Sequence, residues 1–430
     1  MKVLMFGWEF PPYISGGLGT ACYGITKGLV ENDVDVAFVV PSAKGSTNNG
    51  RFRLITAEDA LKRNRSIPGK TSHSRTRRTQ VYASRSMISP YHTSESIYSV
   101  SSDSSSSRTS ARGSPGYGSV LDFSGNYGRN LYKEVHDYCL IGEILAEDEE
   151  FDVIHAHDWL TFPVGMTARE VSGKPLVVHV HATEFDRNGE NINQEIYRIE
   201  RAGMEAADKV IAVSQMVKNT ITQRYGIPPE KVDVVHNAVS RETKIGKNSV
   251  RKSLKEKIVL FMGRITMQKG PEYFLEAARL VLAKDRNVRF VMAGSGDMMQ
   301  RMIVQMAKHR IADRFHFTGF LRGADVERMY AQSDLYVMPS VSEPFGISAF
   351  EACLYDIPII ISRQSGVSEV MKNAVTVDFW DVQKLAAVML AILSNETFAS
   401  EIVGKCRLQM RDISWNMAGN RIKQVYSSVC

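Results

Sequence analysis

The sequence lacks any apolar run long enough to cross a membrane and any arrangement of cysteines that suggests a disulfide framework. Its longest apolar stretches, such as 36–40, have the length of a strand, whereas a membrane-spanning helix needs about 18 residues. The five cysteines in 430 residues are scattered and without CxxC spacing, which argues against disulfides and structural zinc. The N-terminal MKVLMFGWEFPP resembles a first strand more than a secretory signal. These features predict no integral membrane segment and a cytoplasmic location.

The charge is unevenly distributed along the chain. The 53 lysines and arginines exceed the 47 acids, for a net charge of +6. Residues 51–115 alone hold 12 basic and four acidic residues, a surplus of eight, which leaves the rest of the chain at −2. Because the basic excess belongs to one segment, we predict no nucleic-acid partner. A hydrophobic content of 43% is ordinary for globular proteins and allows a sizeable core.

Serine dominates one segment, residues 66–118, which has no hydrophobic period. Such a composition buries too little apolar surface to offset the entropy of ordering. It predicts a disordered or mobile insertion. This insertion is either a variable surface loop or a functional element, such as a lid on the acceptor side or a phosphorylatable arm.

Short β-branched runs alternate with helical patterns, which is typical of βαβ units and parallel, doubly wound sheets. The pattern restarts after a polar stretch near residue 240. We therefore predict an α/β protein with domains at 1–240 and 258–410, a linker at 241–257, and a helical segment at 411–430 that packs back on the first domain. The predicted strands are 2–6, 35–40, 153–157, 176–181, 210–213, 232–235, 258–262, 289–293, 315–318, 335–338 and 357–361.

Two cations follow the first strand of the second domain. Arg264 and Lys269 lie five residues apart in the loop that leads to a helix predicted over 272–283. In an open parallel sheet, ligands bind beyond the carboxyl ends of the strands, where helix N-termini present free N–H groups. A forked guanidinium and a point-charge ammonium at that place suit a diphosphate. On their own, these two residues fit a solvated loop equally well.

The next strand ends add small residues and two carboxylates. Gly294 and Gly296 would let a ligand approach the backbone closely. Further along, Glu343 precedes and Glu351 follows Gly346, where a helix is expected to begin. Free N–H groups at that helix start could hold phosphate oxygens, and a carboxylate inside the helix could accept both hydroxyls of a ribose.

Together these residues resemble the donor site of retaining family 4 glycosyltransferases. The resemblance rests on the loop from Arg264 to Lys269, on the Glu-Pro-Phe-Gly segment 343–346, and on Glu351 eight positions after Glu343. The first half, with SGGLG at 15–19, HAHDW at 155–159, VHATE at 180–184 and VHNA at 235–238, is similar to bacterial glycogen synthase-like members. Ile14 stands where glycogen and starch synthases carry lysine, and Phe345 where they tend to have cysteine. Both departures favour the broader family.

The resemblance implies the GT-B fold, in which two Rossmann-like, doubly wound parallel-sheet domains face each other across a cleft. It implies that Arg264 and Lys269 hold the donor diphosphate, Glu351 the ribose and Glu343 the sugar hydroxyls, with His181 near the reacting carbon. The catalytic residues implied are Glu343, Lys269, Arg264 and His181, and the substrate-binding residues are Gly16, Gly17, Gly294, Gly296, Phe345, Gly346, Ile347 and Glu351.

The implied activity is transfer of a hexosyl unit, glucose, from UDP-glucose or ADP-glucose to an α-glucan-like acceptor, with retention of configuration. The resemblance implies no cofactor and no metal, since cations and helix dipoles stabilise the leaving group. Three alternatives remain open: a sugar-nucleotide 2-epimerase on the same fold, a nucleotide-sugar-binding regulator, and a transferase with a lipid or other non-glucan acceptor.

Two His-x-His pairs fall at neighbouring strand ends: His155 with His157, and His179 with His181. Strand alternation places both members of a pair on one side, so a zinc site is geometrically conceivable. No cysteine is near them in sequence, and the phosphate site has its own cations. We therefore predict no metal site, a sugar contact for His181, and core positions for His155 and His179.

Overall fold

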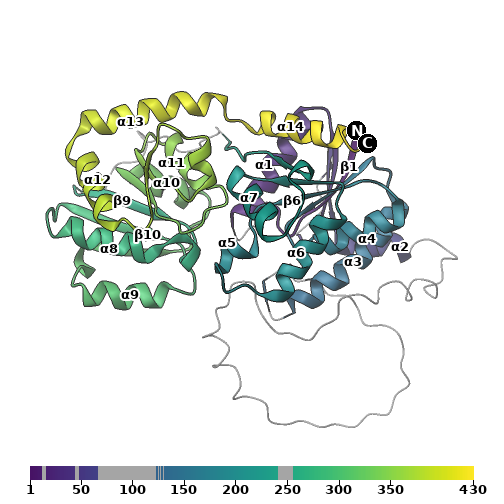
Figure 1. Ribbon diagram of the computed structural model, residues 1–430, viewed down its shortest axis with the longest axis horizontal. Coiled ribbons are helices and arrows are strands. Elements are labelled where there is room, and N and C mark those ends of the chain that lie inside the picture. Colours follow the sequence, from purple (N-terminus) through teal and green to yellow (C-terminus); the bar gives the residue numbers. More distant parts are fainter. Residues whose placement is uncertain are drawn as a thin grey trace, which may run out of the picture.

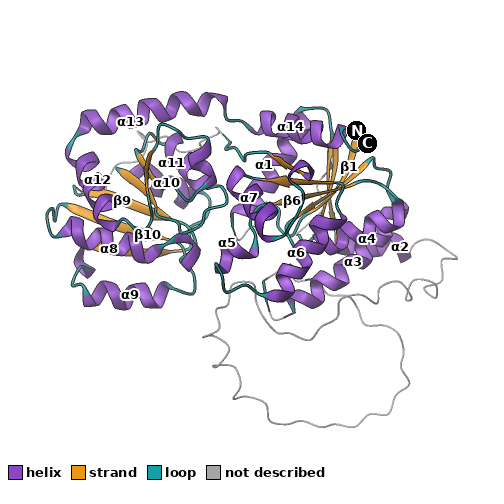
Figure 2. Cartoon of the chain, in the orientation of Figure 1, coloured by secondary structure: helices purple, strands orange, loops and turns teal. Residues whose placement is uncertain are grey.

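The computed structural model describes residues 1–11, 16–43, 48–65, 123, 125, 127–128, 130–240 and 255–430. Two α/β lobes lie side by side (Figure 1), and helices cover both faces of each sheet (Figure 2). The predicted fold class, α/β with two doubly wound parallel-sheet domains, is confirmed. The serine-rich segment 66–118 and the polar stretch 241–254 lie outside the described residues, and the predicted domain boundaries stay predictions.

The sheet of the first lobe has eight strands in the order β3-β4-β2-β1-β5-β6-β7-β8. All neighbours are parallel except β3 and β4, which run antiparallel. The strand order reverses between β1 and β5, which creates a switch point at the carboxyl ends of these strands. The strands are β1 (Lys2–Phe6), β2 (Asp35–Val40), β3 (Asn48–Asn49), β4 (Phe52–Thr56), β5 (Val153–His157), β6 (Leu176–Val180), β7 (Lys209–Ala212) and β8 (Val232–Val234).

The sheet of the second lobe has six parallel strands in the order β11-β10-β9-β12-β13-β14. Its switch point lies between β9 and β12. Both sheets have central strands that are buried on the two faces, as expected where helices cover both sides. The strands are β9 (Lys257–Met262), β10 (Val288–Ala293), β11 (Phe315–Gly319), β12 (Leu335–Met338), β13 (Ile359–Ser362) and β14 (Val375–Val377).

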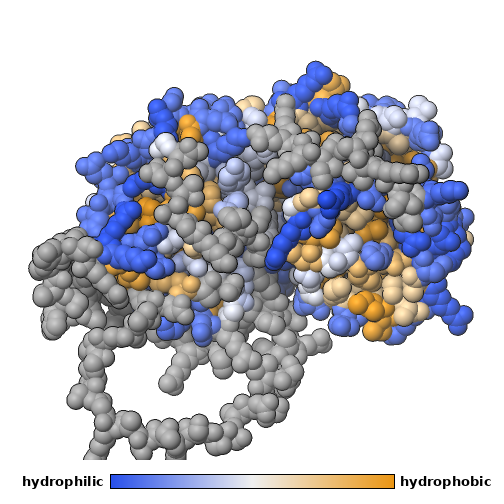
Figure 3. Space-filling view, turned by 180° about the vertical axis from the view of Figure 1, so that it is seen from behind, coloured by the Kyte–Doolittle hydropathy of each residue, from blue (hydrophilic) through white to orange (hydrophobic). Residues whose placement is uncertain are grey.

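Helices connect the strands and form the outer layers of both lobes (Figure 2). No single described helix is long and apolar enough to cross a membrane, although one bent pair, Val382–Ser394 with Glu396–Asp412, passes on length and composition. Seen from behind, the described surface is largely hydrophilic with scattered apolar patches (Figure 3). The helices are α1 (Gly17–Glu31), α2 (Ala57–Arg65), α3 (Leu131–Asp148), α4 (Phe162–Ser172), α5 (Glu184–Asn188), α6 (Gln194–Ala206), α7 (Gln215–Arg224), α8 (Pro271–Leu282), α9 (Met299–Lys308), α10 (Ala324–Gln332), α11 (Ile347–Leu354), α12 (Val382–Ser394), α13 (Glu396–Gln409) and α14 (Trp415–Ser427).

Helix α14 lies on the first lobe, against α1 (Figure 1). Glycines allow the two helices to approach closely: a Cβ on Gly28 would lie 1.9 Å from the carbonyl oxygen of Trp415, and one on Gly24 would lie 2.0 Å from the Trp415 ring. Asn32 donates a hydrogen bond to the Asn416 carbonyl (2.8 Å). The side chains of α14 thus complete the apolar layer between α1 and the sheet.

Candidate active site

A cleft of about 370 Å³ lies between the lobes, at the carboxyl ends of both sheets. The first lobe contributes residues that follow β1, β5 and β6, and the second lobe contributes residues that follow β9, β10 and β12. Since β1 and β5 flank one switch point, and β9 and β12 the other, the cleft lies where open α/β sheets bind their ligands.

Nearly all site residues predicted from the sequence line this cleft. The exception is Gly296, which is absent from the lining. A Cβ there would lie 2.2 Å from the carbonyl oxygen of Ile265, so this glycine packs against the Arg264 loop and does not open space for a ligand. The predicted residues that do line the cleft are Gly16, Gly17, His181, Arg264, Lys269, Gly294, Glu343, Phe345, Gly346, Ile347 and Glu351.

Lys269 and Glu343 form an ion pair in the second-lobe wall, with Nζ 2.6 Å from Oε2. Lys269 ends a short 3₁₀ turn, and the left-handed Gly270 then starts α8. The same Glu343 oxygen accepts a hydrogen bond from the Ser340 hydroxyl (3.2 Å). The Glu343 backbone is held by Gln364 and Gly366. The ammonium of Lys269 and the carboxylate of Glu343 thus lie side by side at the wall of the cleft.

Helix α11 begins in the cleft and carries Glu351. Gly346 has φ 108°, a conformation that favours glycine, and α11 starts at the next residue, so its first N–H groups lie at the cleft wall. Glu351 Oε2 accepts a hydrogen bond from the Tyr330 hydroxyl (2.9 Å). Burial raises the pKa of Glu351, and the bond from Tyr330 opposes that shift. Phe345 is buried against Phe350, so this segment places mainly backbone in the cleft.

Helix α1 also begins at the cleft. Gly16 and Gly17 line it, and a Cβ on either residue would meet no atom of the described residues within 4 Å. No contact with the described part of the chain therefore requires glycine at these two positions. The open space leaves room for a ligand beside the positive end of a 15-residue helix.

Asp158 fixes the main chain of His181. It follows β5 with φ 58°, unusual for a residue with a side chain. Its Oδ1 accepts the backbone N–H groups of His181 (2.6 Å) and Ala182 (3.4 Å). Burial raises the pKa of Asp158 to about 6. The predicted strand through His181 ends one residue earlier, at Val180, so His181 lies at the strand end in the cleft wall.

The four histidines form a stacked column on one face of the sheet. His157 pairs with His179 in the register of β5 and β6, and the column continues to His155 at one end and His181 at the other. Nitrogens of His155, His157 and His179 lie within 4.8 Å of one another, as do ligand atoms of Cys22, His157 and His181. Because nitrogen lone pairs lie in the ring planes, the stacked rings, 5–29° apart for the first trio, do not direct them at one point. Burial lowers the pKa of every ring.

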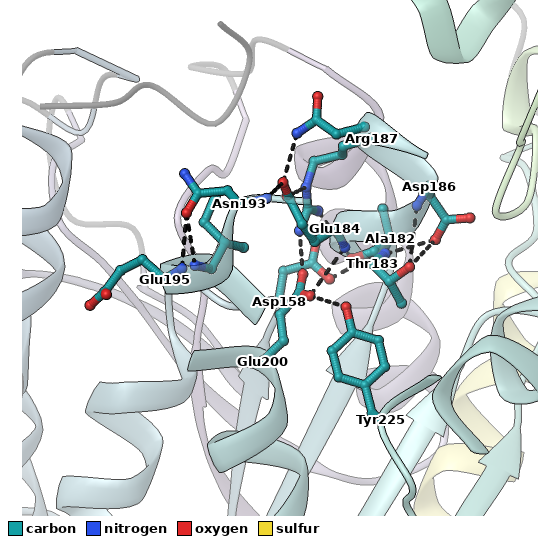
Figure 4. Close-up of polar contacts among 12 residues, drawn as sticks. Asp158, Ala182, Thr183, Glu184, Asp186, Arg187, Asn193, Glu195, Glu200 and Tyr225 are labelled. Carbon is teal, nitrogen blue, oxygen red and sulfur yellow. Dashed lines mark hydrogen bonds and ion pairs between the residues drawn. The ribbon is translucent and has the colours of Figure 1, made fainter. Parts of the chain in front are cut away.

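A buried ionic cluster joins α5 to α6 (Figure 4). Arg187 lines the cleft and contacts both Glu184 (3.3 Å) and Glu200. The Tyr225 hydroxyl donates to Glu200, and Asn193 N–H donates to Glu184 Oε1 (2.8 Å). Two carboxylates thus share one guanidinium, and burial raises the pKa of Glu200 to about 7.

The raised pKa of Glu200 predicts a contribution to stability that falls with rising pH. Between its ordinary value of 4.5 and about 7, the folded chain holds a proton on Glu200 that the unfolded chain has released, so the Glu200 contribution to the free energy of unfolding should decrease over that window, by about 1–3 kcal/mol. The four stacked histidines, whose pKa values are lowered, contribute in the opposite direction below pH 6.5. In denaturant unfolding at pH 5, 6 and 7, Glu200→Gln should therefore gain stability relative to wild type as the pH rises. Glu205→Gln, on the exposed face of the same helix, is the control. Equal slopes for wild type and Glu200→Gln would contradict the assignment.

Three residues of the site were not predicted individually: Asp158, Arg187 and Tyr330. Asp158 lies within the HAHDW segment, and its place at a strand end was an available signal. Arg187 and Tyr330 gave no such signal, because their importance depends on partners on other elements.

Two contacts join the lobes beside the cleft. The Ser342 hydroxyl donates to Asp186 Oδ1 (2.6 Å). Glu369 of the second lobe accepts the first N–H groups of α7, from Gln215 and Met216 (both 2.8 Å), and lies 2.9 Å from His236 Nε2. These bonds hold the two walls of the cleft in the observed orientation.

Comparisons with known proteins agree with this architecture. Residues 125–243 match the model of glycosyltransferase family 4, and residues 242–408 match that of glycosyl transferases group 1. An uncharacterised glycosyltransferase of Methanocaldococcus jannaschii is 28% identical, over 99% of this chain and 98% of the relative. The glycogen synthase of Mycobacterium tuberculosis is 26% identical over 64% of this chain and 68% of that protein.

Solved structures share the fold at low identity. Sucrose-phosphate synthase from Thermosynechococcus elongatus superimposes with a TM-score of 0.71 at 16% identity, covering 99% of this chain and 98% of that one. Anabaena HepE, solved in complex with UDP and glucose, gives a TM-score of 0.66 at 17% identity and full coverage of both chains.

Proposed function

The chain belongs to the family 4 glycosyltransferases with the GT-B fold, and from this premise we propose that it transfers a glucosyl unit from UDP-glucose or ADP-glucose to an α-glucan-like acceptor, with retention of configuration. That it is a glycosyltransferase follows from the family matches. The donor, the acceptor and the stereochemistry are the proposal. The observation that carries it is the grouping of Arg264, Lys269, Glu343 and Glu351 in one cleft with two helix N-termini.

The second-lobe wall suits a nucleoside diphosphate. Arg264 and Lys269 would neutralise the phosphates, together with the N–H groups at the starts of α1 and α11. Glu351, held by Tyr330, would accept the ribose hydroxyls. Glu343 would bind hydroxyls of the sugar while keeping Lys269 in place. These roles need no resident metal, since fixed cations and backbone dipoles can stabilise the leaving diphosphate.

The proposed reaction is one displacement at the anomeric carbon. The bond from that carbon to the diphosphate oxygen breaks, and the acceptor hydroxyl oxygen bonds to the same face. The hydroxyl proton passes to the departing phosphate. Lys269 and Arg264 act on the charge that develops on the diphosphate, so their contribution is larger in the transition state than in the bound substrate. Glu343 and Glu351 are both engaged by partners of the second lobe, and we assign neither as a nucleophile.

The similarity to a glycogen synthase supports a glucan acceptor. A second acceptor class is favoured by relatives named D-inositol 3-phosphate glycosyltransferase, one of them from a Mycobacterium species and 29% identical over 60% of this chain. Free cysteines at all five positions are compatible with the reducing cytoplasm in which we place the enzyme.

A thermal-shift panel tests the donor. UDP, ADP, UDP-glucose and ADP-glucose are added to the full chain. Either the two uridine ligands or the two adenine ligands should raise Tm by mass action. No shift with any of them would overturn the proposed donor class. The preferred donor is then incubated with maltoheptaose, with inositol phosphate and alone. Transfer to maltoheptaose supports the proposal, transfer to inositol phosphate replaces the acceptor, and conversion of the donor alone would indicate an epimerase.

A further inference from the structure

His181 is held by two neighbours, and one of them contacts its ring. Its backbone N–H is bonded to Asp158, and its Nε2 lies 2.9 Å from Nδ1 of His157. Among the described residues, Nδ1 of His181 has no hydrogen-bond partner and is not among the buried unpaired atoms, so this nitrogen is accessible from the cleft. A single proton lies between Nδ1 of His157 and Nε2 of His181, and it is bound either to the one or to the other.

Two tautomer pairs satisfy the His157–His181 contact. If His157 carries its proton on Nδ1, it donates to His181, whose own proton is then on Nδ1 in the cleft. If His157 carries its proton on Nε2, that N–H is buried without a partner among the described residues, because Nε2 is one of the buried unpaired atoms. A buried unsatisfied N–H is rarer in proteins than an unsatisfied acceptor.

The surroundings of the column keep both rings neutral. His155 and His179 flank His157 by stacking, with centroids 4.3 and 5.3 Å away, and Cys22 of α1 offers a thiol within 4.8 Å. Burial lowers the pKa of His181 to about 3 and raises that of Cys22, so neither is charged near neutral pH. The state of His181 is therefore a matter of tautomer and not of charge.

We propose that His157 is a positioning residue that donates through Nδ1 to His181 and so fixes His181 as an Nδ1–H donor facing the cleft. Resting on the proposed function, the partner of that N–H is an oxygen of the transferred sugar. An Nδ1–H that is fixed as a donor favours a hydrogen-bond acceptor of the substrate, such as an oxygen, at that point and disfavours a substrate donor. His181 alone could not supply this specificity, since a free imidazole can present Nδ1 either as a donor or as an acceptor.

Long-range ¹H–¹⁵N correlation on the full chain with ¹⁵N-labelled histidine tests this inference, because Nδ1–H and Nε2–H imidazoles give different patterns. Loss of signals in His181→Asn assigns the ring. We expect Nδ1–H for His181 in the wild type and a change to Nε2–H in His157→Phe. His157→Asn, whose amide can donate from the position of Nδ1, should keep Nδ1–H. His179→Phe is the matched control, since its buried ring stacks on His181 at 4.4 Å without bonding to it.

Turnover should follow the tautomer: about a tenfold fall in kcat for His157→Phe, a recovery in His157→Asn, and a smaller effect for His179→Phe. An Nε2–H pattern for His181 in the wild type would overturn the inference, even if the variants failed to fold. So would an unchanged pattern in a folded His157→Phe. The tautomer measurement uses no sugar nucleotide, so its failure is distinct from a failure of the proposed transfer, which the thermal-shift panel tests.

Discussion

Lys269→Ala is expected to lower kcat by about 100- to 1,000-fold while leaving the fold intact. The side chain is only partly buried, at the cleft, and its Nζ contacts Glu343. Its removal takes a cation from the position proposed for the diphosphate and leaves the Ser340 hydroxyl as the side-chain partner of the Glu343 carboxylate among the described residues. The leaving group then departs with less compensation of its charge. Initial rates at saturating donor measure the effect.

Two controls separate charge from geometry at this position. Lys284→Ala removes an exposed lysine just beyond α8 and should leave kcat unchanged. Lys269→Arg keeps the charge but presents a planar fork in place of a point charge, so we expect partial activity. An unchanged thermal midpoint confirms that Lys269→Ala is folded. A kcat within about twofold of wild type would remove Lys269 from the site.

Glu343→Ala is also expected to reduce turnover by orders of magnitude. Its backbone is held by Gln364 and Gly366, so loss of the carboxylate should leave the loop in place. The variant loses the proposed sugar contact and frees Lys269 to adopt other rotamers. Glu343→Gln keeps the shape but not the charge, so it shows how much of the effect depends on the ion pair. Near-normal kcat in Glu343→Ala would refute the assignment.

The double variant tests whether the two residues act as one unit. Side chains in direct contact give non-additive effects, so Lys269→Ala with Glu343→Ala should cost much less than the product of the single losses. Additive losses would mean that the ion pair exists only in the absence of substrate and that each residue then contacts the substrate independently of the other.

Much of the fold could be predicted because βαβ repetition is a local signal. β12 has the predicted bounds, and β1, β2 and β5 do as well. The strands β3, β4 and β14 were not predicted, and several connecting helices, α3 among them, were not predicted either. β4 lies in the basic flank of the serine-rich segment, where charged residues interrupt its alternation, and β14 has only three residues.

Site residues could be predicted where they directly follow a strand. They could not be predicted where their role depends on a contact with a residue distant in sequence. Arg264, Lys269 and Glu343 could be identified because each follows a strand end. The ion pair itself joins positions 74 residues apart, and no periodicity encodes it. The left-handed conformation of Asp158 was equally hidden, because it depends on the two N–H groups that its carboxylate accepts.

The contact between α1 and α14 has a consequence for the order of events during translation. The face of the first sheet that α1 covers includes Trp415, Ile422 and Tyr426 among its buried residues, yet all six strands of the second sheet are synthesised before them. At about 5–20 residues per second, the ribosome takes roughly 20–80 s to make the chain between α1 and α14. During that interval the glycine-lined surface of α1 has no α14 to cover it. The first lobe to be synthesised is therefore the last to complete its core.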